Sequence, residues 1–297
     1  MHSQFTVGTD TEFFLQDENG YVSAIRYIAA GKHNPLTLPS GGNITHDNVA
    51  LEFATPVANS EDGLISAVES SLKESLSCLP DGITLDLAPS TDFPESELQD
   101  EEARMFGCDP DYDAWDLCMN EAPDDAAEKP FRTVGGHLHL GYVEKSGNDF
   151  LLEPMGKVFT VKTLDAIVGV TMTIFDYTEA TVNRRKLYGK AGCHRPTEYG
   201  VEYRALSNFW LFSPSLVRLV YNLASESLRL VREGKIDSIL DSIGEKEIRR
   251  IIDTGDNVAA MGVWNTVITP NMSERTIKLF EECISKQEIN LYNEWGL

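Results

Sequence analysis

The 297-residue sequence predicts a single domain of the α+β class. Segments rich in β-branched and aromatic residues, which is the composition of strands, recur through the first two thirds. Apolar residues at helical spacing dominate the last third, where we expect helices at about 214–232, 235–253 and 273–291. Neither an internal repeat nor a low-complexity linker interrupts the chain. We therefore expect one domain over residues 1–297, with a helical C-terminal part from about 214.

The earlier elements are predicted from turn signals, helix caps and apolar periodicity. We first expect a hairpin at 4–25 around Asp17-Glu18-Asn19-Gly20, an exposed loop at 31–43, a strand at 48–57 and a helix from Ser60 to about Leu79. An irregular acidic insertion follows at about 86–130, and then a strand at 133–143. After these we expect a buried helix from Phe159 to about Ala180, an Arg-rich loop and a strand at 201–210.

The net charge is −22, and so negative a surface repels phosphates, so we expect no direct binding of duplex nucleic acid. Residues 86–130 alone carry 15 acidic and two basic side chains. This insertion is either a solvated surface or a means of attracting a cationic or amine-bearing substrate. No apolar run has the length of a membrane helix, and the N-terminus lacks the pattern of a secretion signal. With five scattered cysteines, we expect reduced thiols and a cytoplasmic protein.

Acidic and imidazole side chains interrupt three strand-like segments. Asp10 and Glu12 are two residues apart, so both project from one side of a strand and suit a hard cation such as magnesium. Glu52 lies between leucine and phenylalanine, where it must be metal-bound, ion-paired or directed outward. His137 and His139 also share one face, between glycines that allow a ligand to approach. The alternatives are a solvated strand face and histidines hydrogen-bonded to their neighbours.

A basic segment at 183–195 contrasts with the acidity of the rest of the chain. It holds five Lys or Arg residues and two glycines, and the guanidinium fork matches phosphate oxygens. The segment therefore predicts a polyphosphate partner, or alternatively a salt-bridged loop that neutralises the protein's own carboxylates. Glu202 and Arg204 follow on a predicted strand. They either hold a metal and stabilise a transferring phosphoryl group, or form a structural ion pair.

Together these segments predict a divalent-metal site that holds a polyphosphate. A zinc hydrolase would leave the basic segment without a purpose, and a metal-free acid–base enzyme would not need so many carboxylates. The motifs are GTDTEFF, DNVALEFATP, FGCDPDYDAW, GGHLHLGY and RRKLYGKAGCHRPTEYGVEYRALSNFW. In these motifs the chain resembles, from about Gly8 to Trp210, the carboxylate–amine ligases related to glutamate–cysteine ligase and glutamine synthetase. It is most similar to the small phage-type amidoligases of that superfamily.

The resemblance implies a curved, mainly antiparallel sheet that cradles the active site and is backed by helices, as in the catalytic domain of glutamine synthetase. It implies ATP and magnesium, or manganese, as cofactors. The implied metal ligands are Asp10, Glu12, Glu52, His139 and Glu202. The implied ATP- and phosphate-binding residues are Arg184, Arg185, Lys190, His137 and Arg204, and the catalytic arginines are Arg185, Arg195 and Arg204. Larger relatives carry more acidic residues on the first two metal strands, so Asp47 is needed here and the number of metals stays open.

The motif FGCDPDYDAW is typical of the small phage-type members, and we expect Asp109, Asp111, Tyr112 and Trp115 to line the acceptor pocket. The expected reaction joins a carboxylate, plausibly glutamate, to an amine through an acyl phosphate. The substrates are small molecules, and their identity and the oligomeric state stay open. The rival hypotheses are a phosphotransferase that phosphorylates a guanidine or carboxylate, a metal hydrolase that uses His137 and His139, and an acidic binding protein without activity.

Overall fold

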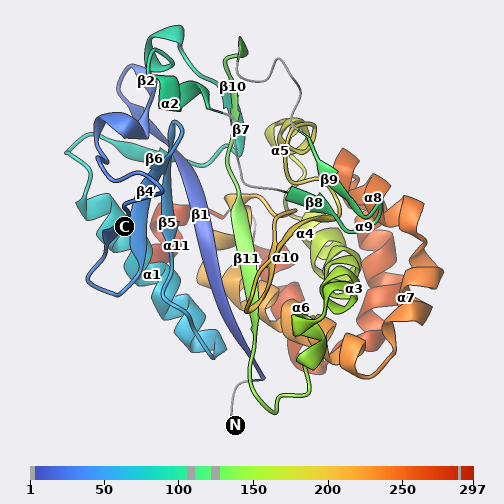
Figure 1. Cartoon of the computed structure of the whole chain (residues 1–297). Coiled ribbons are helices and arrows are strands. Elements are labelled where there is room, and N and C mark those ends of the chain that lie inside the picture. The colour runs from blue at the N-terminus through green and yellow to red at the C-terminus, as the bar shows by residue number, and fades with distance from the viewer. Residues whose placement is uncertain (1–3, 106–110, 122–127, 287–288) are drawn as a thin grey trace.

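A computed structural model describes residues 4–105, 111–121, 128–286 and 289–297 (Figure 1). Its strands are β1 (Phe5–Asp17), β2 (Gly20–Val22), β3 (Leu36–Thr37), β4 (Asn43–Asp47), β5 (Ala50–Ala54), β6 (Thr84–Asp86), β7 (Ser90–Asp92), β8 (Asp111–Asp113), β9 (Cys118–Asn120), β10 (Phe131–Thr133), β11 (Gly136–Tyr142), β12 (Cys193–Pro196) and β13 (Gly200–Tyr203). Its helices are α1 (Glu61–Ser77), α2 (Glu101–Arg104), α3 (Pro154–Leu164), α4 (Val170–Thr173), α5 (Glu179–Arg185), α6 (Pro214–Arg232), α7 (Ile236–Ile243), α8 (Glu245–Thr254), α9 (Asn257–Val263), α10 (Glu274–Ser285) and α11 (Leu291–Trp295).

The main sheet has the strand order β3-β4-β5-β1-β11-β13-β12-β8-β9, and its neighbouring strands pair antiparallel. Strands that are distant in the sequence become neighbours at its centre, where β1 pairs with β5 on one side and β11 on the other. Helices, among them α6, α10 and α11, lie behind β1 and β11 in Figure 1. The predicted α+β class, with a large antiparallel sheet backed by helices, is confirmed.

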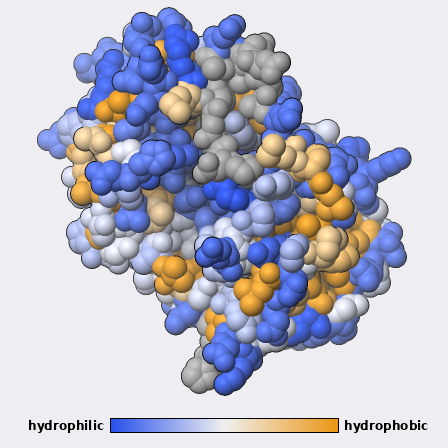
Figure 2. Space-filling view, in the orientation of Figure 1, coloured by the Kyte–Doolittle hydropathy of each residue, from blue (hydrophilic) through white to orange (hydrophobic). Residues whose placement is uncertain are grey.

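The two faces of the sheet differ in polarity because side chains alternate along each strand. Leu138, Val201 and Tyr203 project from the face that packs against the helices, and all three are fully buried. Their sequence neighbours project from the opposite, open face, which is the one with Asp10 and Glu12. Hydrophilic residues occupy the middle of the molecular surface in Figure 2. The sheet thus presents a row of polar side chains on a rigid, well-packed support.

The helix predicted at Phe159–Ala180 differs from the observed structure. It begins earlier, at Pro154, passes through a π-helical turn at Asp165–Gly169, and ends at Thr173. Thr178 then caps a separate helix, α5, by accepting a hydrogen bond from a backbone N–H. The basic segment therefore begins inside a helix and not in a loop. Gly244, with φ of 85°, likewise divides the helix expected at 235–253 into α7 and α8.

The acidic insertion contributes to the fold in the part that the structure describes. Its strand β7 pairs with β10, which follows the insertion, and its strand β8 extends the main sheet beyond β12. Cys78, Cys118, Cys193 and Cys283 are free thiols, as expected, and Cys108 lies outside the described residues. None of the helices in the described ranges is long and apolar enough to span a bilayer.

Candidate functional site

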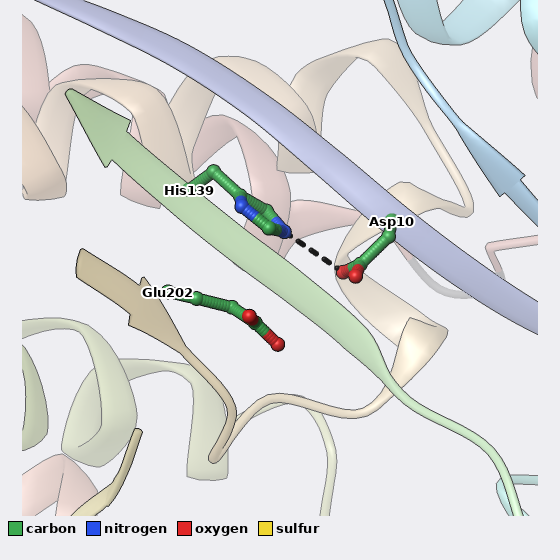
Figure 3. A group of neighbouring side chains, drawn as sticks. All are labelled: Asp10, His139 and Glu202. Carbon is green, nitrogen blue, oxygen red and sulfur yellow. Dashed lines mark ion pairs between the residues drawn. The ribbon is translucent and has the colours of Figure 1, made fainter. Parts of the chain in front are cut away.

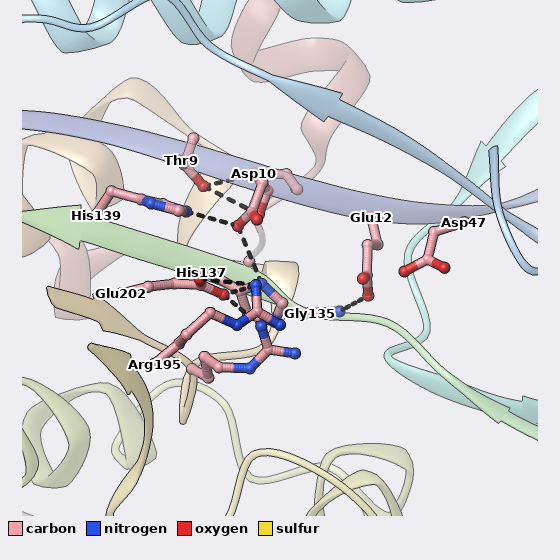
Figure 4. A network of polar contacts seen from close by, with 12 residues as sticks. Thr9, Asp10, Glu12, Asp47, Gly135, His137, His139, Arg195 and Glu202 are labelled. Carbon is pink, nitrogen blue, oxygen red and sulfur yellow. Dashed lines mark hydrogen bonds and ion pairs between the residues drawn. The ribbon is translucent and has the colours of Figure 1, made fainter. Parts of the chain in front are cut away.

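Most of the predicted site residues come together on the open face of the sheet, and Figure 4 labels Asp10, Glu12, His137, His139, Arg195 and Glu202 among them. Register explains the gathering: Asp10 lies opposite His137, Glu12 opposite Glu52, and His139 opposite Glu202 in neighbouring antiparallel strands. Arg204 follows β13 directly and contacts Glu202. Residues that are up to almost 200 positions apart in the sequence thus form a continuous polar row across β5, β1, β11 and β13.

One group of potential metal ligands consists of Asp10, His139 and Glu202, and their ligand atoms all lie within 4.8 Å of one another (Figure 3). His139 Nε2 and His137 Nδ1 each lie 3.0 Å from the same oxygen, Asp10 Oδ1. These three atoms are buried, and their contacts with one another are ion pairs that lack hydrogen-bond geometry. Buried polar atoms that converge without hydrogen bonds are the arrangement that a cation would satisfy.

The second group consists of Glu12, Asp47 and Glu52, with ligand atoms that also lie within 4.8 Å of one another. Glu12 is held by the backbone N–H of Gly135, which donates to Oε2 at 2.7 Å. Asp47 is 2.6 Å from the ammonium nitrogen of Lys32. Asp47 joins the group because β4 and β5 form a hairpin that brings the end of β4 beside Glu52. The structure therefore brings Asp47 to Glu12 and Glu52, as the family resemblance requires of an additional carboxylate.

The pKa values on this face reflect burial and the neighbouring charges. Burial raises the pKa of Glu52 well above its ordinary value, and repulsion from Asp10, Asp47 and Glu12 raises it further. Burial also raises the pKa of Glu12, although His137 partly opposes this effect. The carboxylates therefore repel one another in the absence of a cation, and a divalent cation among them would relieve that repulsion.

The pKa values of Asp10 and His139 are shifted in the directions that favour a charged pair. Burial acts to raise the pKa of Asp10, but His137 and His139 outweigh it and hold that pKa well below its usual range. Burial acts to lower the pKa of His139, and the contact with Asp10 outweighs it so that the pKa is raised. On its other side, His139 Nδ1 lies 2.5 Å from the hydroxyl of Tyr199. Tyr199 therefore orients the imidazole so that Nε2 faces Asp10.

Two arginines hold Glu202 on β13, at the end of the row away from Glu52. Arg195 Nη1 donates to Oε2 at 3.1 Å, and Arg204 Nη1 donates to Oε1. Arg204 Nε also lies 3.4 Å from Asp111 Oδ1, so its buried guanidinium bridges two carboxylates. Asp111 is thus the residue of the acidic insertion that the structure brings to this group. These guanidiniums sit where they can reach an anion bound over the row.

Arg184 borders the same face, but its guanidinium contacts backbone carbonyls and does not point into the place expected for phosphate. Its guanidinium donates to three backbone carbonyl oxygens, those of Val134 at 2.7 Å, Ala205 at 3.2 Å and Arg204 at 3.2 Å. A Cβ at Gly189, where φ is 74°, would lie 1.9 Å from this guanidinium, so the loop requires glycine there. Arg184 therefore fastens the chain that carries the site, and its donors point at the protein backbone.

The structure does not bring Arg185 and Lys190 to the polar row. Arg185 Nη1 donates at 2.5 Å to the carbonyl of Ile252 in α8, because successive helical residues point in different directions and α5 directs Arg185 into the helical layer. Lys190 is half-exposed, with its ammonium 4.0 Å from Asp113.

Tyr112 and Trp115 are also absent from the polar row. Tyr112 is paired with His194 on the face that turns toward the helices, since strand residues alternate. The indole of Trp115 donates to Asp165 at 2.6 Å in the helical layer. The predicted substrate residue Asp109 lies outside the described residues.

Sequence reasoning missed two residues at the site. Arg132 lines the end of the site near Glu12, His137 and Arg204, while its guanidinium also donates to backbone carbonyls, including that of Ala103 at 3.1 Å. Tyr199 was part of a motif but was given no role. No periodic signal in the sequence marks either residue as part of a site, because each contacts residues that are distant along the chain.

The chain was compared with protein-family models, curated proteins and solved structures. No curated protein sequence matches the chain. Among solved structures, a bifunctional glutathione synthetase from Pasteurella multocida has a TM-score of 0.39 and 10% identity, over 99% of this chain and 51% of that chain. The present chain thus spans about half the length of that protein. The model of the family described as phage phiEco32-like COOH.NH2 ligase-type 2 matches residues 126–238, so the resemblance indicated by the motifs is confirmed and the chain is similar to this ligase family across β11, β12 and β13.

Proposed function

We propose that this protein is an ATP- and magnesium-dependent ligase that joins a carboxylate to an amine. The observation that carries the proposal is the polar row itself: two groups of potential cation ligands and the guanidinium of Arg204 share one face of one sheet. This arrangement is what phosphoryl transfer requires, since its catalysis depends on positioning and charge neutralisation. The match to a ligase family over residues 126–238 supports the assignment to amide-bond formation.

Divalent cations fit both groups. The group of Glu12, Asp47 and Glu52 offers carboxylate oxygens alone, which magnesium prefers, and the group of Asp10, His139 and Glu202 adds one imidazole, which manganese also accepts. We therefore propose two cation sites on the row. When bound, magnesium would neutralise phosphate oxygens and make the γ-phosphorus more susceptible to attack.

The proposed reaction has two steps. In the first, a carboxylate oxygen of the donor substrate attacks the γ-phosphorus, the bond to the bridging oxygen of ADP breaks, and an acyl phosphate forms. Arg204 and Arg195, which converge on Glu202, are positioned to stabilise the charge on the transferring phosphoryl oxygens. Glutamate is the donor that the family resemblance favours, and we propose it as the first carboxylate to test.

In the second step the amine nitrogen attacks the acyl carbon, the carbon–oxygen bond to phosphate breaks, and inorganic phosphate leaves. The nitrogen also loses a proton, and we propose that an acidic residue of the segment 109–116 accepts it. Asp111 is the strongest candidate, because its carboxylate contacts Arg204, whereas Asp113 and Asp116 contact Arg249. The products are an amide, ADP and phosphate.

The decisive experiment is incubation of the protein with ATP, magnesium and pools of carboxylates and amines. We expect phosphate release together with a product whose mass is the sum of the two substrates minus water. Arg204→Ala and Glu202→Ala should each reduce this turnover by on the order of 10²–10³ or more, as expected for loss of a transition-state contact. Near-normal turnover in both variants would show that the site is wrongly assigned.

The rival functions give different products. A phosphotransferase on the same sheet would yield a stable phosphorylated compound and no condensation product. A metal hydrolase that uses His137 and His139 would act without nucleotide. A binding protein without a nucleotide site would show no thermal stabilisation by ATP and magnesium, whereas a ligand that binds only the folded state raises its stability with concentration.

A further inference from the structure

A lysine already contacts one of the two groups of potential metal ligands. The ammonium nitrogen of Lys32 lies 2.6 Å from Asp47, which forms the second group together with Glu12 and Glu52. Burial raises the pKa of Glu12 and of Glu52, and the Lys32 ammonium opposes this shift in both. Its positive charge therefore acts on all three carboxylates, at the place where we propose a divalent cation.

The backbone holds Lys32 beside this group. Gly31 forms a parallel bridge with His46 on β4, and the carbonyl of Ala30 accepts a hydrogen bond from the N–H of His46 at 2.8 Å. Lys32 and Asp47 are the next residues of the two paired segments, so the bridge brings them side by side. A Cβ at Gly31 would lie 3.4 Å from the imidazole of His46, so the loop runs in contact with β4. The ion pair is thus a consequence of how this loop pairs with β4.

A pocket of about 170 Å³ gives the Lys32 ammonium an alternative to Asp47. Thr45 lies directly opposite Glu52 in the β4–β5 pair, and its buried hydroxyl oxygen forms no hydrogen bond with any described residue. An ammonium donates hydrogen bonds and a hydroxyl oxygen accepts them, so Thr45 can receive the Lys32 ammonium when it leaves Asp47. The residues that line this pocket are Lys32, Pro35, Asn43, Thr45, Glu52 and Ala54.

We infer that Lys32 competes with a divalent cation for the second group and thereby lowers the cation affinity of that site. An ion pair between side chains that are 42% and 21% exposed holds the ammonium only weakly, so a cation of double charge can replace it at Asp47. The replacement still has a cost, because two cations that share one carboxylate repel each other. The site therefore fills at a higher magnesium concentration than it would without Lys32. The inference rests on the proposed cation sites, which belong to the proposed ligase function.

Lys32→Met tests the inference, because methionine keeps an unbranched side chain and removes the ammonium. Mn²⁺ is titrated into the full chain without nucleotide, and free Mn²⁺ is measured by electron paramagnetic resonance. We expect the variant to bind Mn²⁺ at the second group at least about ten times more tightly than the wild type. Lys32→Arg, which keeps the positive charge, should bind Mn²⁺ as the wild type does.

Two controls locate the effect. Lys73 on α1 also contacts one carboxylate at 2.6 Å, that of Glu69, and its side chain is 48% exposed. Lys73→Met therefore removes a comparable ion pair elsewhere on the protein and should leave Mn²⁺ binding unchanged. In a Glu52→Gln background, which lacks one ligand of the second group, Lys32→Met should produce a much smaller gain in affinity, because residues that act on one site have non-additive effects.

The outcomes separate the two hypotheses. Unchanged or weaker Mn²⁺ binding in Lys32→Met, or an equal gain in Lys32→Arg or Lys73→Met, would overturn the inference about Lys32. The proposed cation sites would still stand in those cases if the wild-type protein binds Mn²⁺. Absence of Mn²⁺ binding in both the wild type and Lys32→Met would instead contradict the proposed function itself. If Lys32→Met does not fold, Lys32→Gln takes its place in each comparison.

Discussion

Glu12 on β1 and Glu52 on β5 are directly opposite each other in an antiparallel pair, and Asp47 reaches the same point from β4. Like charges in this position destabilise a sheet. This arrangement is unfavourable without a ligand, and the divalent cation that we propose here would make it favourable.

Glu52→Gln should have opposite effects with and without metal. In the presence of EDTA the variant should be more stable than the wild type, by about 0.5–1 kcal/mol, because a repulsive charge is removed. With magnesium or manganese the wild type should gain more stability than the variant, since one ligand oxygen is lost. Melting curves in the two conditions measure both effects. The control, Glu281→Gln on the exposed side of α10, should change neither the stability in EDTA nor the stabilisation by metal. If metal stabilises Glu52→Gln as much as the wild type, Glu52 is not a ligand.

Tyr199→Phe should weaken cation binding through His139. The hydroxyl of Tyr199 contacts Nδ1, and this contact leaves Nε2 directed at Asp10. Loss of such an orienting partner typically lowers metal affinity 10–100-fold. Titration with Mn²⁺, followed by electron paramagnetic resonance, measures the affinity directly. Tyr177→Phe, at an exposed tyrosine, is the matched control, and equal affinities in the two variants would contradict the proposed role.

Arg184→Met should lower the free energy of unfolding, because Arg184 contacts the protein backbone. The variant keeps an unbranched apolar stem but removes the donors to three backbone carbonyls. Each buried carbonyl left without a partner costs about 1–3 kcal/mol, so we expect a loss of about 3 kcal/mol or more. Urea denaturation should show a lower midpoint with an unchanged slope. Lys186→Met, at the exposed residue that follows α5, should be the milder change. An equal loss in Lys186→Met would contradict the role given to Arg184.

Asp165 should make stability depend on pH. Burial raises the pKa of Asp165 to about 7, and its carboxylate accepts hydrogen bonds from Tyr203 and Trp115. Its pKa in the unfolded chain is about 3.9. Between these values the folded protein binds more protons than the unfolded chain, so this group's contribution to stability is full below about pH 4 and is lost as the pH rises through about 7.

Asp165→Asn removes this titration and keeps the shape of the side chain. The Asn amide can donate to the oxygen of Tyr203 and accept from the indole of Trp115. Relative to wild type, the variant should therefore gain stability between pH 5 and pH 8, by at most on the order of 4 kcal/mol. Chemical denaturation at several pH values measures the difference. Parallel pH profiles for the two proteins would show that Asp165 does not titrate in this range.

Local sequence patterns predicted which side chains share a face. Asp10 and Glu12, and likewise His137 and His139, are two residues apart on one strand, and Arg204 directly follows the strand that carries Glu202; alternation directs each pair to one side. The cap at Ser60 and the hairpin that joins β1 to β2 were also predictable, because a cap and a tight turn depend on a few adjacent residues.

Contacts between distant segments were not predictable in this way. Arg184 and Arg185 look alike in the basic segment, yet one holds the backbone beside the site and the other turns into the helical layer. Tyr112 was expected at the acceptor pocket and instead faces the helices. In each case the direction of the side chain is set by the helix or strand that carries it and by what that element packs against.

The sequence by itself determined the chemistry available to this protein: an acidic chain with paired carboxylates, paired imidazoles and a basic segment placed on regular elements. Only the tertiary structure decided that β1 would lie between β5 and β11 and that Asp47 would join Glu12 and Glu52. The physical reason is that periodicity is a property of neighbouring residues, whereas strand order and register depend on how the whole chain buries its apolar surface.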